Sequence, residues 1–327
     1  MPEPMLDEHD IIELITRRFG RLPDGYLPIG DDVALVPPGR TGESAVLKSD
    51  MLVAKTDVPP GMSWKMASRK AVAMCVSDFA AKGVLPTAFM VAVGLPKGTP
   101  RGKVVALSSG LLQASREWSV KLVGGDTNEA DDLVIDCTMV GFAERIVRRD
   151  GASPGEYVVT TGPFGEAPAG LRVLIDGAKA EHAFKKRAVS SVLLPKPRLA
   201  AGVALSGCLS SSIDSSDGLA MSLFSISEMS GVGIRLGEIP YAKGLKEFAS
   251  RNSYSAEELA LYGGEEYEIV GTVAKRRFQA AKDGAWSAGI ELRVIGETVP
   301  REELKGVAFT DGRRVRRDGW VHFGGKR

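Results

Sequence analysis

The chain has 327 residues, of which 44% are hydrophobic and 25% are charged, as in a folded globular protein with room for two full cores. Its 42 basic and 41 acidic residues leave a net charge of +1, so no charge imbalance indicates a nucleic-acid or anionic-membrane partner. No apolar run reaches membrane-spanning length, and the acidic, polar N-terminus does not resemble a signal peptide. Three widely spaced cysteines (Cys75, Cys137 and Cys208) favour buried side chains in a reducing compartment over a disulfide frame or a zinc site. We therefore expect a soluble cytoplasmic protein with no nucleic-acid or membrane partner.

Hydrophobic periodicity in the first half predicts helices mixed with strands. Glycines stand where two of the helices are expected to end, at Gly20 and Gly83. The expected helices cover residues 6–19, 63–82 and 103–118, and the expected strands cover 33–35, 45–47, 51–54, 88–95, 121–123 and 133–142.

A polar and basic segment between residues 145 and 155 ends in Ser153-Pro154-Gly155, which is typical of a domain boundary. We divide the chain there into residues 1–148 and 149–327. The second half is expected to contain strands at 157–161, up to 213, 267–273 and 292–295, and helices at 167–174, 198–205, 219–229 and 276–288. Because strands and helices mix throughout, the predicted class is α/β or α+β.

Aspartates recur in short turns that follow apolar runs. Mg²⁺ prefers oxygen ligands and commonly joins carboxylates to substrate phosphates, and converging carboxylates would repel one another without a cation. One such aspartate is usually a turn former or a helix cap, as Asp217 could be for the helix after it. Five such turns together favour a single metal and polyphosphate site. They are Gly30-Asp31-Asp32, Lys48-Ser49-Asp50, Ser77-Asp78, Gly124-Gly125-Asp126-Thr127 and Asp214-Ser215-Ser216-Asp217-Gly218.

Asp78 falls near the C-terminal end of its expected helix, where the helix dipole disfavours a negative charge. We therefore expect a positive group beside it.

Other phosphate-binding and hydrolase motifs are absent from the sequence. There is no G-x-x-x-x-G-K-[ST] and no G-x-G-x-x-G after a strand, so phosphate would depend on metals and scattered donors. Gly162 and Gly165 could present backbone amides to a phosphate, although a plain tight turn fits them as well. The three histidines lie in no triad-like setting and no G-x-S-x-G is present, which disfavours nucleophilic hydrolysis. The basic run 313–317 is expected to be a solvated surface.

The aspartate turns and Gly263-Gly264-Glu265-Glu266-Tyr267-Glu268 follow the order seen in thiamine-monophosphate kinases, within the aminoimidazole ribonucleotide synthetase superfamily. The chain resembles that family over nearly its full length. The resemblance implies a two-domain aminoimidazole ribonucleotide synthetase-like fold and a homodimer in which the N-terminal sheets pair into a shared barrel. It also implies that ATP phosphorylates thiamine monophosphate to thiamine diphosphate with the help of Mg²⁺.

The resemblance also implies roles for individual residues. Asp57 stands where the family usually has a substrate-contacting histidine, and we place it with the substrate-binding residues. Trp320 matches a thiamine-holding position, but it could equally be a core aromatic. The implied magnesium ligands are Asp32, Ser49, Asp50, Asp78, Asp126, Asp214 and Asp217; the ATP contacts are Gly125, Asp126, Arg149 and Ser216; and the substrate contacts are Asp57, Glu265 and Trp320.

The acceptor in such a reaction is a phosphate monoester, whose second pKa of about 6 makes it a competent nucleophile at neutral pH. Direct in-line transfer then needs positioning and charge neutralisation and no catalytic side chain. Two alternatives stay open, a ligase of the aminoimidazole ribonucleotide synthetase type and a non-catalytic metal or nucleotide-binding scaffold. The lack of a cysteine before Cys75 and the ending Gly324-Gly325-Lys326-Arg327 disfavour the superfamily's selenophosphate synthetases and hydrogenase-maturation proteins.

Overall fold

The structure, a computed structural model, describes residues 24–27, 31–37 and 42–320. The expected helix at 6–19 and Gly30 of the first acidic turn lie outside the described residues. No helix in the described ranges is long and apolar enough to cross a membrane.

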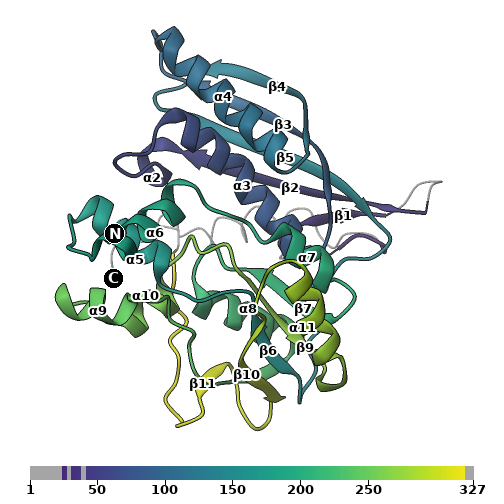
Figure 1. The fold of residues 1–327 in the computed structure, drawn as a ribbon. Coiled ribbons are helices and arrows are strands. Elements are labelled where there is room, and N and C mark those ends of the chain that lie inside the picture. Colours follow the sequence, from purple (N-terminus) through teal and green to yellow (C-terminus); the bar gives the residue numbers. More distant parts are fainter. Residues whose placement is uncertain (1–23, 28–30, 38–41, 321–327) are drawn as a thin grey trace, which may run out of the picture.

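The first half of the chain forms a five-stranded sheet in the order β1-β2-β5-β3-β4. Only the β3–β4 pair is parallel. Helices α3 and α4 lie against one face of this sheet (Figure 1). The elements are β1 (Ala34–Val36), β2 (Ser44–Val53), α2 (Ala54–Asp57), α3 (Trp64–Lys82), β3 (Pro86–Leu95), α4 (Arg101–Glu117), β4 (Lys121–Glu129) and β5 (Val134–Ala143).

The second half forms a six-stranded sheet in the order β11-β8-β10-β6-β9-β7, with only β11 and β8 parallel. The largest core cluster of this half joins the sheet to the helices beside it. The elements are β6 (Tyr157–Thr160), α5 (Glu166–Ile175), α6 (His182–Leu193), α7 (Leu199–Leu205), β7 (Leu209–Asp214), α8 (Leu219–Ser230), β8 (Val232–Leu236), α9 (Leu245–Arg251), α10 (Ala256–Tyr262), β9 (Ile269–Val273), the 3₁₀ turn η1 (Lys275–Arg277), α11 (Phe278–Ser287), β10 (Arg293–Pro300) and β11 (Val307–Phe309).

Helix α3 lies where the two halves of the molecule meet (Figure 1). Ser63 caps its start, with the hydroxyl accepting a hydrogen bond from the Met66 amide at 3.3 Å, and Gly83 ends it in a left-handed conformation at φ 69°. Both boundaries match the helix predicted from the sequence. A Cβ built on Gly202 of α7 would lie 1.9 Å from the Ala80 carbonyl oxygen, so only glycine permits this close approach of α7 to α3. Polar side chains of α3 therefore reach both halves of the chain.

Two of the wrongly predicted strand boundaries concern candidate site residues. Strand β2 runs unbroken from Ser44 to Val53, so Asp50 lies within a strand and not in a turn between two strands. Strand β4 extends to Glu129, so Asp126 also lies within a strand. In both places backbone pairing with neighbouring strands continues through residues whose composition suggested a turn. Helices α2, α6, α9 and α10 and strands β8 and β11 were not predicted.

Candidate active site

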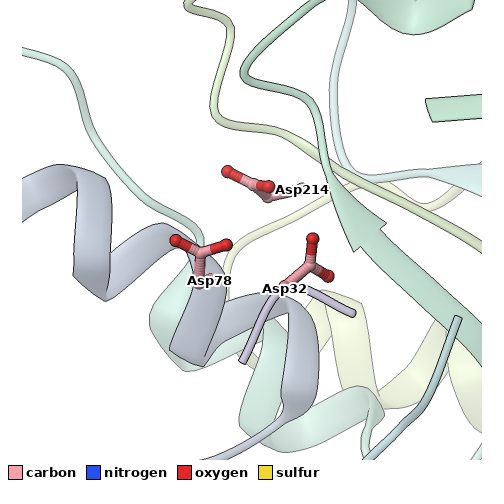
Figure 2. A group of neighbouring side chains, drawn as sticks. All are labelled: Asp32, Asp78 and Asp214. Atoms are coloured by element: carbon pink, nitrogen blue, oxygen red, sulfur yellow. The ribbon is translucent and has the colours of Figure 1, made fainter. Parts of the chain in front are cut away.

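Three aspartates from distant parts of the chain converge at the junction of the two halves. Asp32 precedes β1, Asp78 belongs to the last turns of α3, and Asp214 ends β7. One carboxylate oxygen from each lies within 4.8 Å of the others, and all three residues are buried. Figure 2 shows the three carboxylates turned toward a common point. We call Asp32, Asp78 and Asp214 the acidic cluster.

The cluster is held in place by contacts across the two halves. The Ser77 hydroxyl, on α3, donates a hydrogen bond to Asp214 Oδ2 at 2.8 Å. Since Ser77 and Asp78 are adjacent on one helix, this bond fixes the distance between helix and strand at the point where their carboxylates meet. The short pair Ser77-Asp78 thus both contributes to the cluster and positions it.

Lys48 of β2 supplies the positive group that the sequence predicted beside Asp78. Its Nζ lies 3.1 Å from Asp78 Oδ2 and 3.2 Å from Asp50 Oδ1. Although burial disfavours its charge, the two carboxylates hold the pKa of Lys48 well above its ordinary value. Lys48 therefore links Asp50 to the acidic cluster.

A second lysine, Lys82, compensates the charges on the other side of the cluster. It is fully buried, with Nζ 2.7 Å from Asp31 Oδ1, 2.5 Å from Asp32 Oδ2 and 2.7 Å from the Ser212 carbonyl oxygen. Arg149 also pairs with Asp32. The Asp31 carboxylate accepts the backbone amides of Asp32 at 2.7 Å and Arg149 at 3.1 Å. The Asp31 carboxylate is therefore bound by two backbone amides and by Lys82, whereas the Asp32 carboxylate belongs to the acidic cluster.

Burial raises the pKa of both Asp78 and Asp214, and for Asp78 the neighbouring carboxylates of Asp214 and Asp50 raise it further. Burial also lowers the pKa of Lys82 and of Arg149, although nearby carboxylates oppose the change. A divalent cation would act in the opposite sense on the aspartates, because it favours their charged form.

The cluster fits a hard divalent cation. Its donors are all carboxylate oxygens, the ligand type that Mg²⁺ selects. Among the described residues, the buried Asp32 carboxylate is paired with Lys82 and Arg149, so a bound cation would share this carboxylate with them.

A second group of predicted residues gathers on loops of the second half. The amide of Glu265 donates to the Ser216 carbonyl oxygen at 2.6 Å, and the amide of Trp320 donates to the Asp217 carbonyl oxygen at 3.1 Å. Helix α8 is capped by Gly218 without a side-chain bond, so Asp217 is not the helix cap it could have been. Trp320 is 53% exposed, which excludes the core-aromatic alternative.

Ser49, Gly125 and Asp126 do not join the acidic cluster within one chain. Ser49 donates to Asp136 Oδ1 at 3.0 Å on the sheet face opposite α3. Asp126 pairs in register with Ala92 on the edge strand β4, three strands from β2, or about 14 Å at ~4.8 Å per strand. The register places Asp126 on that same face, which we call the open face, and the whole of β4 is exposed. Their predicted contacts with metal and ATP therefore stay predictions.

Asp57 and Gly165 use their polar groups locally. Asp57 Oδ2 accepts the Val53 amide at 2.7 Å, which fixes the short helix α2. The Gly165 amide, at the start of α5, donates to the Glu266 carboxylate. Burial raises the pKa of Glu266 to about 8. Gly165 therefore belongs to a turn closed by this chain's own side chain, and not to a phosphate loop.

Residues 30–143 match the family model described as AIR synthase related protein, N-terminal domain, which defines the class of the first half. The whole chain is 34% identical to the thiamine-monophosphate kinase of Nitrosopumilus maritimus, over 97% of this chain and 99% of that one. It is 32% identical to the thiamine-monophosphate kinase of Pyrococcus abyssi, over 97% and 96% of the two chains. The solved structure of AaThiL complexed with AMPPCP and TMP superposes with a TM-score of 0.86 at 27% identity, over 98% of this chain and 99% of that one. The chain belongs to the thiamine-monophosphate kinase family, and its fold is the two-sheet fold of that family.

Sequence reasoning named Arg149 but missed the lysines of the site. Lys48 stands inside a quoted motif, and the dipole argument on Asp78 indicated such a partner without naming it. Lys82 and Lys70, both buried on α3, gave no signal beyond their position on an otherwise apolar helix. Tyr267 is buried near Glu265 and Asp214, and burial raises its pKa well above the ordinary value.

Proposed function

We propose that this protein transfers the γ-phosphoryl group of ATP to thiamine monophosphate and forms thiamine diphosphate. One observation carries the proposal: three buried carboxylates from distant segments lie within 4.8 Å of one another at the junction of the two halves. The burial of three acids together costs free energy unless a cation joins them. Membership of the thiamine-monophosphate kinase family and the likeness to a relative bound to AMPPCP and TMP support the choice of substrates.

The proposed division of labour follows the two groups of residues. Asp32, Asp78 and Asp214, with Asp50 beside them and with Asp217 from the loop before α8, would hold Mg²⁺, which when bound neutralises the charge of the phosphates. Arg149 and Ser216 would contact ATP. Glu265 and Trp320 would hold the thiamine moiety, since a carboxylate suits its cationic thiazolium ring and an exposed indole suits stacking. The acceptor phosphate attacks directly, so the chain's own task is to align two polyanions.

The first test is formation of product. Incubation with Mg²⁺, ATP and thiamine monophosphate is expected to yield thiamine diphosphate and ADP in equal amounts, because one phosphoryl group moves per cycle. Chromatography of both products, with and without excess EDTA, measures this, and EDTA is expected to stop the reaction. ATP binding without any thiamine diphosphate would contradict the proposal and favour a non-catalytic scaffold.

We also propose that the protein is a homodimer paired through the open face of the first sheet. Large apolar side chains stand on this face, with Met51 57%, Met90 49% and Phe142 51% exposed in the single chain. Such a patch marks an association surface. Pairing there would bring Ser49 and Asp126 of one subunit against the other, which supports their predicted roles in a shared site.

The dimer is expected to have a mass of about 70 kDa, twice the 34.8 kDa of one chain. Met90→Glu should yield the monomer, because it places charge in the proposed apolar interface. Sedimentation measures both masses, and Trp286→Glu, at a 76% exposed aromatic on α11, serves as the control. A monomeric wild-type protein would refute the proposal.

Two further expectations stay proposals. We propose the division into residues 1–148 and 149–327, which agrees with the first sheet ending at Ala143 and the second beginning at Tyr157. We propose a cytoplasmic location, because a reducing compartment suits three free cysteines.

A further inference from the structure

Lys70 is a buried cation that the proposed reaction does not otherwise use. It belongs to α3 and is 1% exposed. Its ammonium group pairs with the Glu265 carboxylate and donates to the Asp57 carbonyl oxygen at 3.1 Å. Asp57 comes from the first half of the chain and Glu265 from the second. Lys70 therefore joins the two segments that the family resemblance assigns to the substrate.

Glu265 is held in an unusual conformation. Its backbone has φ 67°, in the left-handed region that costs free energy for a residue with a side chain. Tyr267, two residues later, has φ 53°. Such a turn persists only where its surroundings fix it, and here the Ser216 carbonyl oxygen and the Lys70 ammonium group both do so.

One of the two oxygens of the Glu265 carboxylate has a hydrogen-bond donor among the described residues, and the other has none. Oε1 receives the Lys70 ammonium group, while Oε2 is shielded from solvent and has no hydrogen-bond partner within the part of the chain that the structure describes. An unmet buried acceptor costs ~1–3 kcal/mol, more for a charged group. The lysine thus fixes the carboxylate and leaves one oxygen for a donor or a cation from outside.

We propose that Lys70 is a positioning residue for the acceptor site. It holds the Glu265 carboxylate against the Asp57 segment so that Oε2 meets the amine or the cationic ring of the thiamine moiety. This inference rests on the proposed function and deepens it. A small ammonium group suits this role, because it donates to a carboxylate and a carbonyl at once, whereas the planar fork of arginine demands a different geometry.

A purely structural role for Lys70 makes a different prediction. If the lysine only joined the two halves, its loss would lower the stability of the protein and would lower the affinity for both substrates alike. If the lysine positions Glu265, its loss lowers the affinity for thiamine monophosphate and leaves the affinity for ATP unchanged. The two cases are therefore separated by comparing the two substrates.

The test uses the full-length variants Lys70→Met, Lys70→Arg, Glu265→Gln and Lys70→Met with Glu265→Gln. Calorimetry measures the Kd of thiamine monophosphate and of a non-hydrolysable ATP analogue, and steady-state kinetics measures both KM values. We expect Lys70→Met to raise the Kd and KM for thiamine monophosphate about 10- to 100-fold, as for a lost hydrogen bond to a charged group, with less than about 2-fold change for the nucleotide. The double variant should bind thiamine monophosphate no more weakly than Glu265→Gln alone, because both changes remove the same carboxylate contact. Lys65→Met, at an exposed lysine of the same helix, is the control.

An unchanged Kd for thiamine monophosphate in Lys70→Met, or an equal loss for both ligands, would overturn the inference. Should Lys70→Met fail to fold, Lys70→Arg decides: we expect a selective loss of at least about 3-fold for thiamine monophosphate, and wild-type affinity would refute the proposal. Wild-type protein that binds thiamine monophosphate but makes no product would refute the proposed function alone, since the calorimetric comparison stands without turnover.

Discussion

Replacing Asp78 with asparagine is expected to lower kcat about 10³-fold while the protein still folds. Asparagine keeps the shape of the side chain but loses the charge at the centre of the acidic cluster, and removal of one preorganised electrostatic contact commonly costs that much. The fold should tolerate the change, because Asp78 is buried beside Asp50 and Asp214, and the negative charges of these two residues repel that of Asp78. Lys48 keeps Asp50 as a partner.

Product formation under saturating Mg²⁺, ATP and thiamine monophosphate measures this loss, and thermal unfolding checks the fold. Asp283→Asn, at an exposed aspartate of α11, is the matched control and should keep kcat within about 2-fold of the wild type. A folded Asp78→Asn protein with more than about a tenth of the wild-type kcat would remove Asp78 from the proposed site.

Lys82→Met is expected to destabilise the metal-free protein by about 3–5 kcal/mol, the usual cost of breaking a buried ion pair by removing one partner. Lys82 is fully buried against Asp31, Asp32 and the Ser212 carbonyl oxygen. Methionine fills the space of the chain but leaves the two carboxylates without that cation. Saturating Mg²⁺ should recover part of the loss, because the metal supplies positive charge to Asp32.

Urea unfolding with EDTA and with saturating Mg²⁺ measures both free energies of unfolding. Lys186→Met, at an exposed lysine of α6, should change each by no more than about 0.5 kcal/mol. If Lys82→Met is as stable as the wild type in EDTA, then Lys82 does not carry the charge balance of the site.

Much of the site was predictable because local chemistry marked it. Ser63 and Gly83 fixed both ends of α3, so Asp78 fell at the expected place on a helix. Strand β7 ends at Asp214, one residue beyond the predicted end, and Asp32 lies two residues before β1. For these residues the local pattern and the fold agree.

The rest depended on pairing between distant strands. A one-residue change of register moves a side chain to the other face of a sheet. The irregularity between Phe89 and Met90 shifts the pairing with β4, so the face on which Asp126 lies could not be derived from its motif. Ser49 alternates with Asp50 along one strand, and the two therefore lie on opposite faces.

The buried lysines were unpredictable for a different reason. Lysine is rarely buried unless it is paired, and the partners of Lys48, Lys70 and Lys82 include acids that are far away in the sequence. Glu265, for example, is 195 residues from Lys70. Only the folded arrangement shows which acids these lysines meet.

The most direct test of the acidic cluster is calorimetric titration of Mg²⁺ into the protein with a non-hydrolysable ATP analogue. The wild type is expected to bind Mg²⁺ saturably, and Asp78→Asn and Asp214→Asn are each expected to weaken that binding at least about 10-fold, since each removes a charged oxygen ligand. Wild-type Mg²⁺ affinity in both folded variants would contradict the account, because the three carboxylates would then meet for some purpose other than holding the metal.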